Sequence, residues 1–428
     1  MHADETPPMT PTRTLGPTAP AVPRTEAPAQ GTGPAPWVFR LVMVGLVLTA
    51  LNLRPAITSL GALLEEVRDG LHMSGSVAGV LTSVPPLCFA VFGIMAPRLA
   101  RRFGPGAVVC AGMAAITAGL VIRPLVGGTA GFLAASALAL MGIAVSNVLM
   151  PVIVKRWFPD RVGSMTGLYS MALALGTSLA AAVTVPMTEA MGGSWKAGLG
   201  VWAALAAAAV LPWIPLVRDR GVAPGHSEAH RPQAPALRIT RSRTAWALAC
   251  FFGLQATAAY ITMGWMPQIF RDAGVSAGTA GVLLALTMAM GVPLAFVIPR
   301  VAARMRNQGP IVVLLGACGL AGYAGLYLAP SGGAWLWALL LGVSNCAFPL
   351  ALTMIGMRSR SGAGVVRLSA FAQSTGYLIS IPGPLLVGVL YQHSGGWGLP
   401  IALMAALMVP QMAAGILAGR DRTIEDEC

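Results

Sequence analysis

Arg54 is the residue of this sequence whose type and position could carry the most specific chemistry. It lies deep in an apolar stretch of about 25 residues, where a charged side chain costs ~2.5–3.5 kcal/mol on membrane-insertion scales. All fifteen acidic residues lie in tails, in loops or at the ends of apolar stretches, so the sequence offers Arg54 no central carboxylate. A guanidinium presents a planar fork of donors that matches a carboxylate or another small anion. We therefore predict that Arg54 faces a cavity and binds an anion; the alternative is that it extends to the lipid headgroups.

Uncharged polar residues inside the apolar stretches are the next candidates for a substrate site. They are Asn52, Thr58, Asn147, Asn345, Gln373 and Tyr377. Because residues three or four apart share a helix face, Thr58 accompanies Arg54, and Tyr377 accompanies Gln373. The alternative for Gln373 and Tyr377 is ordinary hydrogen bonding between helices. The alternative for Asn147 and Asn345 is that each side-chain amide donates a hydrogen bond to the backbone carbonyl that a proline four residues later leaves free.

Cysteine and histidine positions argue against a metal site or a cofactor. The six cysteines lie mostly inside apolar stretches without CxxC spacing, and the five histidines lie outside the long apolar stretches. An enzyme acting on polar substrates would need clustered acids or histidines at an aqueous face. The only acidic group of that kind covers residues 65–69. We therefore predict that the protein is not an enzyme and that it has no cofactor and no metal.

The elements that position these residues are predicted to be membrane-spanning helices. The chain has 428 residues, of which 56% are hydrophobic and only 10% charged, outside the usual range of soluble proteins. Apolar stretches long enough to cross a bilayer occur at 38–62, 75–97, 105–123, 131–154, 163–186, 196–216, 246–269, 277–299, 310–329, 334–356, 367–390 and 397–418. They show no two-residue alternation, which excludes membrane β-strands. The predicted fold is an all-α integral membrane protein with twelve transmembrane helices in two six-helix repeats.

Composition also predicts how the chain is divided. Residues 1–36 are rich in proline and lack an apolar core, which indicates a disordered cytoplasmic tail. Residues 37–216 and 246–418 form the two six-helix halves. A polar cytoplasmic linker at 217–245 separates them, and 419–428 form a second cytoplasmic tail.

Basic residues predict the orientation in the membrane. With the N-terminus inside, 23 of the 28 lysines and arginines fall in segments on the cytoplasmic side. Both termini are therefore expected in the cytoplasm, in a multi-pass protein of the cell inner (plasma) membrane. The net charge of +13 is spread over these segments, so nucleic acid is not an expected partner. The expected partners are the lipid bilayer and a small-molecule solute, which the argument from Arg54 predicts to be anionic. The sequence does not reveal the oligomeric state, and a monomer is assumed.

The two halves repeat one another in sequence. The second span begins Ala78-Gly79-Val80-Leu81, and the eighth begins Ala280-Gly281-Val282-Leu283, 202 residues later. Ser146-Asn147 with a later Pro151 recurs as Ser344-Asn345 with Pro349 at a spacing of 198. Matches six spans apart in the same orientation are typical of transporters built from two parallel six-helix repeats.

The loop after the second span carries a family resemblance. It reads Gly93-x-x-x-Pro97-Arg98-x-Ala100-Arg101-Arg102, which resembles the G-x-x-x-D-R-x-G-R-R loop of the major facilitator superfamily. Pro97 replaces the usual Asp and Ala100 the usual Gly, which puts the usual charge relay between loop and helix in doubt. Asn52 to Ser59, Ala96 to Gly104 and Trp265-Met266-Pro267 resemble the branch that contains the cyanate permeases and the nitroimidazole transporters.

The resemblance implies roles for further residues. It adds Gln255 and Tyr260 of span seven to the substrate site. It also assigns gating and topology to the loops at Arg98, Arg101, Arg102, Gly104, Arg300 and Arg304.

Together these features predict a transporter that moves a small anionic solute by alternating access, either by secondary active transport or by facilitated diffusion. The alternatives are a drug or nitroaromatic exporter of the same fold and a membrane-embedded enzyme.

Overall fold

The computed structural model describes residues 36–218 and 238–427. Within these residues every regular element is a helix, and twelve spans are long and apolar enough to cross a membrane, which confirms the predicted fold class. The spans are Pro36–Ala62, Gly75–Phe103, Pro105–Leu125, Thr129–Trp157, Ser164–Ala190, Trp195–Val217, Arg243–Asp272, Ala277–Arg304, Gly309–Leu328, Ala334–Met357, Gly364–Ser394 and Gly398–Ala418. The predicted disordered tail, apart from Pro36, and most of the predicted linker lie outside the described residues.

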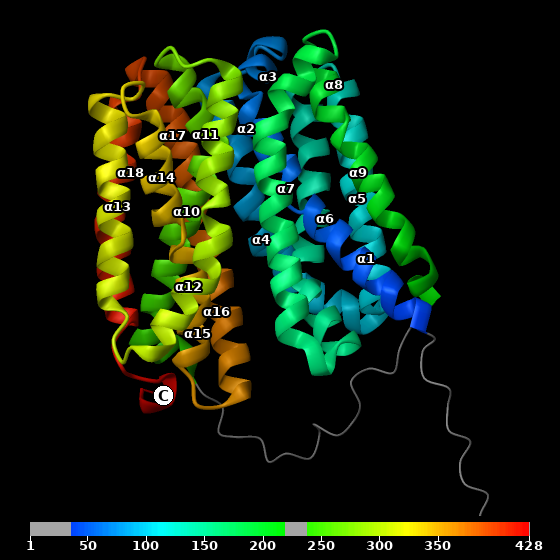
Figure 1. Cartoon of the computed structure of the whole chain (residues 1–428), viewed down its shortest axis with the longest axis vertical. Coiled ribbons are helices and arrows are strands. Elements are labelled where there is room, and N and C mark those ends of the chain that lie inside the picture. The colour runs from blue at the N-terminus through cyan, green and yellow to red at the C-terminus, as the bar shows by residue number, and fades with distance from the viewer. Residues whose placement is uncertain (1–35, 219–237, 428) are drawn as a thin grey trace, which may run out of the picture.

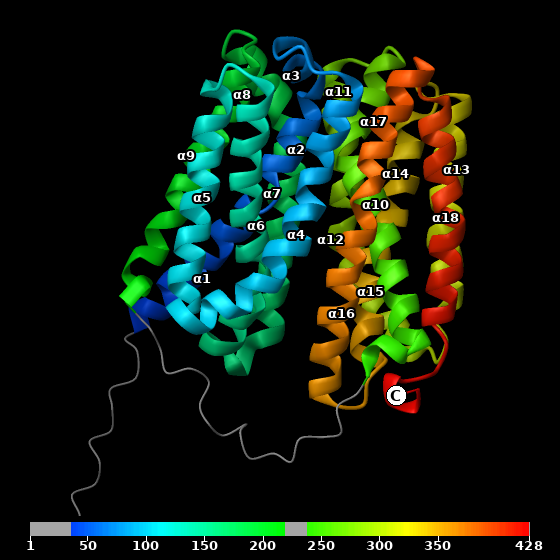
Figure 2. The same cartoon turned by 180° about the vertical axis from the view of Figure 1, so that it is seen from behind.

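The first six spans form one bundle, here called the N-half (Figures 1 and 2). Its elements are α1 (Pro36–Asn52), α2 (Pro55–Ala62), α3 (Leu64–Gly70), α4 (Gly75–Phe103), α5 (Pro105–Leu125), α6 (Thr129–Trp157), η1 (Pro159–Arg161), α7 (Val162–Ala190), α8 (Trp195–Gly200), α9 (Trp202–Val210) and η2 (Leu211–Arg218).

The last six spans form the second bundle, the C-half. Its elements are η3 (Ile239–Arg241), α10 (Arg243–Asp272), α11 (Ala277–Ala289), α12 (Gly291–Arg304), α13 (Gly309–Leu328), α14 (Ala334–Asn345), α15 (Ala347–Met357), α16 (Gly362–Ser380), α17 (Pro382–Ser394), α18 (Gly398–Ala418) and η4 (Ile424–Asp426).

Serine side chains start corresponding helices in the two halves. The Ser74 hydroxyl accepts a hydrogen bond from Val77 N at the start of α4, and the Ser276 hydroxyl accepts one from Thr279 N at the start of α11. Such caps satisfy one of the free N–H groups of a helix N-terminus. The two serines are 276 − 74 = 202 residues apart, the spacing of the sequence repeat.

Several spans are broken helices instead of continuous ones. The first span was predicted as one helix, but α1 ends at Asn52 and α2 begins at Pro55. Proline lacks an N–H and disfavours helical geometry in the residue before it, which here is Arg54, with φ −126°. Before Pro382, α16 gives way to α17, as the prolines and glycines of this span suggested; Ile381 keeps helical angles there, and the missing N–H of Pro382 interrupts the helical hydrogen bonds.

The two ends of the molecule differ in charge and in contact between the halves. The basic end carries the exposed Arg98, Arg101, Arg300 and Arg304. The distal end carries α3 and α8. The halves lie side by side at the distal end and diverge toward the basic end (Figures 1 and 2).

Ion pairs and glycines join the halves at the distal end. Arg271 of α10 pairs with Glu65 at 2.8 Å and with Glu66 at 2.9 Å, both on α3. A Cβ atom on Gly61 of α2 would overlap the carbonyl oxygen of Met263 of α10. The distal contact therefore requires glycine at position 61.

The end of the chain folds against the basic end of the C-half. Ile424 of η4 is fully buried, and the Glu427 carboxylate accepts hydrogen bonds from the Ser242 hydroxyl at 2.6 Å and from Thr244 N at 2.9 Å. The Glu425 carboxylate accepts one from the Ser359 hydroxyl at 2.5 Å. We call residues 423–427 the C-terminal clasp. It places a carboxylate at the N-terminus of α10, where the helix dipole favours negative charge.

Candidate functional site

Arg54 lies in the break between α1 and α2, between the two halves. It occupies the position that precedes the first turn of α2, and its side chain is partly buried. The guanidinium carbon is 6.0 Å from the centre of the Phe89 ring of α4. A discontinuous helix that holds a charged residue near mid-membrane is a recurring feature of transporter binding sites.

Three of the six tyrosines of the chain lie within electrostatic reach of Arg54. Tyr169 belongs to α7, Tyr260 to α10 and Tyr377 to α16. The Tyr260 hydroxyl lies near the Arg54 guanidinium. The Tyr169 hydroxyl donates a hydrogen bond to the side-chain carbonyl of Asn147 at 2.5 Å. Tyrosine hydroxyls from three helices therefore lie around one cation, and an amide from a fourth helix, α6, binds one of them.

Aromatic rings form one side of this group. Tyr377 of the C-half stacks on Phe89 of the N-half, with ring centres 5.0 Å apart and planes 25° apart. Tyr377 also meets Phe252 of α10 edge-on at 5.2 Å. These buried rings pack on one another and make the side of the group next to the guanidinium apolar and aromatic.

Acidic side chains are absent from the surroundings of Arg54 in residues 36–218 and 238–427. The ion pairs of this part of the chain join Arg271 to Glu65 and Glu66 and Arg360 to Asp426. Arg54 takes part in none of them. Its charge is balanced only by tyrosine and amide dipoles and by the Phe89 ring, which leaves it suited to a negatively charged or strongly polar ligand.

The structure thus brings together Arg54, Asn147, Tyr260 and Tyr377 from the predicted substrate residues. Asn52 and Thr58 have other partners. The Asn52 amide donates to the carbonyls of Leu48 and Leu205, and the Thr58 hydroxyl donates to the Arg54 carbonyl at 3.2 Å. These bonds hold the ends of the broken helix in place.

The remaining amides of the predicted site have no contact with Arg54 in the described structure. Gln255 is 2% exposed, and its side-chain oxygen lacks a hydrogen-bond partner among the described residues. The amide nitrogen of Asn345 is likewise buried without a partner there. The Gln373 amide donates to the Ser369 hydroxyl at 2.7 Å, one turn away on α16. Binding by these three residues stays a prediction.

The predicted gating residues lie at the basic end, away from Arg54. The five arginines are exposed, and Arg102 and Arg300 pack over the nearby rings of Phe103 and Phe296. Gly104 has φ +86° between α4 and α5, a conformation that favours glycine. The sharp turn at the end of the loop therefore depends on this residue.

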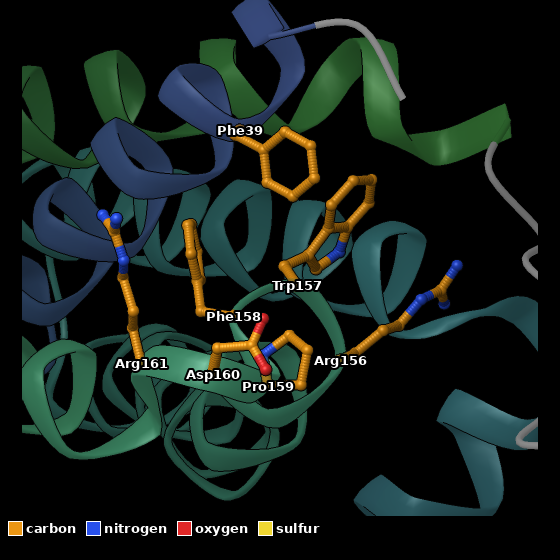
Figure 3. A pocket seen from close by; sticks show the side chains of 7 residues that line it. All are labelled: Phe39, Arg156, Trp157, Phe158, Pro159, Asp160 and Arg161. Carbon is orange, nitrogen blue, oxygen red and sulfur yellow. The ribbon is translucent and has the colours of Figure 1, made fainter. Parts of the chain in front are cut away.

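A pocket also lies at the basic end of the N-half (Figure 3). It has a volume of about 620 Å³ and is lined by Phe39, Arg156, Trp157, Phe158, Pro159, Asp160 and Arg161. The Phe39 ring meets Trp157 and Phe158 at 5.9 and 6.2 Å between ring centres. Because only the N-half contributes to it, this pocket does not connect the two halves as the Arg54 site does.

Sequence reasoning did not identify Phe89, Tyr169 and Arg123 as candidates. Tyrosine is scarce in this chain, and a tyrosine inside an apolar span was the available signal for Tyr169. Arg123 lies near the end of an apolar stretch, and its complete burial follows only from the packing of α5 against α6 and from its hydrogen bond to Ala56 of α2. Among the described residues no three potential ligands are grouped as a metal site would require.

Comparisons with known proteins agree with this architecture. The family model described as Major Facilitator Superfamily matches residues 42–359. An uncharacterized transporter of Bacillus subtilis, YycB, is 36% identical over 388 residues, which are 90% of this chain and 94% of that protein.

Two further relatives come from Escherichia coli. A 2-nitroimidazole transporter is 32% identical over 390 residues, 90% of this chain and 97% of that protein. A cyanate transport protein is 31% identical over 372 residues, 87% of this chain and 95% of that protein.

Solved structures share the fold at low sequence identity. The nucleoside transporter NupG superposes with a TM-score of 0.72 at 12% identity, over 88% of this chain and 99% of NupG. A D-xylose–proton symporter gives a TM-score of 0.68 at 13% identity, over 91% of this chain and 99% of that chain.

Proposed function

Because this chain belongs to the major facilitator superfamily and is a multi-pass membrane transporter, we propose that it carries a small anionic solute bound at Arg54 between its two halves. The solute alternates between the two sides of the membrane as the N-half and the C-half rock around it. Both termini lie in the cytoplasm and the membrane is the plasma membrane, in agreement with the basic end. The transporter works as a monomer.

The observation that carries this proposal is that Arg54, which has no carboxylate partner among the described residues, is surrounded by groups from both halves. Arg54 belongs to the N-half, whereas Tyr260 and Tyr377 belong to the C-half. An anion on the guanidinium adds a charge-assisted hydrogen bond that the site lacks without it. Since both halves contribute, binding can favour the state in which they close around the solute.

Names of the relatives support a ligand with terminal electronegative atoms. Cyanate is a small anion, and a nitro group carries two planar oxygens in the geometry of a carboxylate. A guanidinium fork can donate hydrogen bonds to either group, and the aromatic surroundings formed by Phe89 and Tyr377 favour a planar body. The proposed solute class is therefore a small anion, including aromatic carboxylates.

The aromatic surface also supports a second candidate, the export of neutral nitroaromatic compounds. In that case the rings contribute most of the binding energy and Arg54 only orients the nitro group. The two candidates differ in how strongly transport depends on the charge at position 54.

Transport in proteoliposomes tests the proposal. Purified protein is assayed with radiolabelled cyanate, 4-hydroxybenzoate and 2-nitroimidazole, each with and without a pH gradient. We expect at least one of the two anions to be transported, and Arg54→Ala to lower that rate at least about 100-fold, as expected when the charged partner of a bound anion is removed. Lys196→Gln, which removes an exposed charge at the distal end, is the matched control. Transport of 2-nitroimidazole alone, retained in Arg54→Ala, would favour the exporter.

A further inference from the structure

A second arginine is buried between Arg54 and the distal end. Arg123, in the last turn of α5, is only 1% exposed. One of its terminal nitrogens, Nη1, donates to the Ala56 carbonyl at 3.1 Å, two residues beyond Arg54 in the chain. Its guanidinium carbon lies 5.6 Å from the centre of the Phe132 ring of α6. The charge is therefore held in a fixed position inside the N-half.

Most of the hydrogen-bonding capacity of this arginine is unused within the described part of the chain. Nε and Nη2 of Arg123 are buried and have no partner there, and the same is true of the Ser136 hydroxyl of α6. No ion pair of the described residues includes Arg123. Each unsatisfied buried donor costs ~1–3 kcal/mol, and more for a charged group. A role limited to anchoring Ala56 does not require a cation with these extra donors.

Arg123 and Ser136 line a small cavity to which both halves contribute. Its volume is about 20 Å³, enough for one water-sized group. The N-half contributes Arg123, Ser136 and Thr82, and the C-half contributes Tyr260 and Gly264. Tyr260 is the tyrosine whose hydroxyl lies near Arg54. The two arginines therefore share one tyrosine, with Arg54 on one side and the Arg123 cavity on the other.

Two residues of the distal contact between the halves, Gly61 and Thr82, also line this cavity. The Trp265 indole N–H donates to the Thr82 hydroxyl at 3.2 Å, and Gly61 lies against Met263. When the halves separate at the distal end, Tyr260 and Gly264 move away with the C-half. Arg123 and Ser136 belong to the N-half and stay with it, so we expect them to become open to the distal solution.

We propose that Arg123 and Ser136 form a second anion-binding subsite, which receives the solute from the distal side before it reaches Arg54. Its ligand is a small anion with two acceptor atoms, such as a carboxylate. Two guanidinium donors and one hydroxyl hold it. The inference rests on the proposed function in one respect, that the transported solute is an anion.

Thiol reactivity tests the subsite without requiring the native solute. All six native cysteines are replaced and Ser136→Cys is introduced. An anionic methanethiosulfonate (sulfonatoethyl) and a cationic one (trimethylammonioethyl) are then applied from the distal side. We expect both to reach the thiol, with the anionic reagent favoured by the Arg123 charge. Arg123→Gln should lower the anionic-to-cationic rate ratio at least about tenfold, because removing one nearby charge changes the two energies in opposite directions.

Two controls keep the outcome interpretable. Lys196→Gln removes an exposed distal charge outside the cavity and should change the ratio less than twofold. Thr82→Cys supplies a second reporter on the cavity wall if Ser136→Cys fails to fold. A thiol that no reagent reaches from the distal side, or a ratio that Arg123→Gln leaves unchanged, would overturn the proposal and leave Arg123 as an anchor for Ala56.

This test is separable from that of the central site. If Arg54→Ala still transports anions while the thiol ratio depends on Arg123, the central assignment fails and the subsite stands. If Arg54→Ala abolishes transport while the ratio is independent of Arg123, the central site stands and the subsite fails.

Discussion

The guanidinium of Arg54 and the hydroxyl of Tyr260 lie near each other across the boundary between the two halves of the molecule. One belongs to the broken first span and the other to the long helix α10. A solute bound to Arg54 is therefore within reach of a C-half donor that moves when the halves rock. This geometry gives the site a direct means of sensing which way the transporter faces.

Arg54→Lys separates charge from geometry. Lysine keeps the positive charge but lacks the planar fork, so we expect transport of 4-hydroxybenzoate to fall at least about tenfold, the loss of one charge-assisted hydrogen bond. Cyanate should be affected less because its terminal atoms cannot bind the fork side by side. The ratio of the two uptake rates in proteoliposomes measures this effect. An equal loss for both solutes would contradict bidentate binding.

Tyr260→Phe removes the hydroxyl that lies near Arg54 and leaves the ring in place. We expect the half-saturation concentration of the transported anion to change by about 5–10-fold, because hydrogen bonds to charged groups contribute ~1.5–3 kcal/mol when buried and less when a solute can replace them. Tyr323→Phe is the matched control, since Tyr323 of α13 is equally buried but has no interaction with Arg54. If both variants behave alike, the hydroxyl of Tyr260 has no role in binding.

Arg271→Gln should weaken closure of the distal end. Its side chain is 17% exposed, whereas those of Glu65 and Glu66 are 39% and 30% exposed, so solvent screens the pairs. We expect the closed state to be destabilised by about 1 kcal/mol, which shifts the equilibrium about fivefold toward the state open at the distal end. Spin labels on α3 and α17 measure the population by pulsed distance measurements. The double variant Arg271→Glu with Glu66→Arg should restore closure, and failure of that rescue would argue against the ion pair as the cause.

Neutralising Arg101 and Arg102 together should lower the maximal transport rate and leave the half-saturation concentration within about twofold, because both side chains lie in solvent at the basic end. Arg422→Gln, another exposed arginine at this end, provides the comparison. Initial rates over a range of solute concentrations separate the two constants. A rise in half-saturation alone would place these arginines on the solute pathway.

The C-terminal clasp predicts a dependence of stability on pH. Partial burial alone would raise the pKa of Glu427, but the hydrogen bonds from Ser242 and Thr244 outweigh it and lower the pKa below its ordinary value of 4.5. Hydrogen bonds from Ser359 and the backbone likewise lower the pKa of Glu425. The stabilisation is therefore complete above pH 4.5 and is lost as the pH falls through the lower pKa values of the folded state.

Glu427→Gln tests the clasp. We expect the thermal midpoint at pH 7 to fall by about 2–4 °C. This is the shift that a loss of about 1 kcal/mol causes in a domain of about 150–250 residues, the size of one half. The difference from the unmodified protein should shrink as the pH falls below 4.5. Glu189→Gln, which neutralises an exposed acid of the N-half, should have little effect. A difference that persists unchanged at low pH would show that the carboxylate charge of Glu427 is not the cause.

Hydropathy and the sequence repeat were enough to predict the twelve spans, because each span must satisfy its backbone internally and bury an apolar surface in lipid. They were not enough to predict the break at Arg54. An apolar stretch looks the same whether its helix is continuous or not, and Pro55 can be accommodated in either form. The partners of Asn52 and Thr58 were missed for the same reason, since both bond to backbone carbonyls near that break.

Arg123 shows the other limit of the sequence. Its place near the end of a span is equally compatible with a side chain in the headgroups and with one buried against Ala56 and Phe132. Only the packing of three helices distinguishes the two. Tyr260, in contrast, was identified through family resemblance, and the structure places it beside Arg54.

The glycine contacts of the distal end also bear on how fast the transporter can work. Gly61 meets the Met263 backbone, and Gly79 meets the Leu385 backbone, without a side chain on the glycine. Closing such a contact orders no rotamers on the glycine side, so each cycle avoids the conformational entropy that longer side chains would lose on closure. The contact at the distal end can therefore form and break with little reorganisation. A methyl group at position 61 would clash with the Met263 backbone and hold the carrier open to that side.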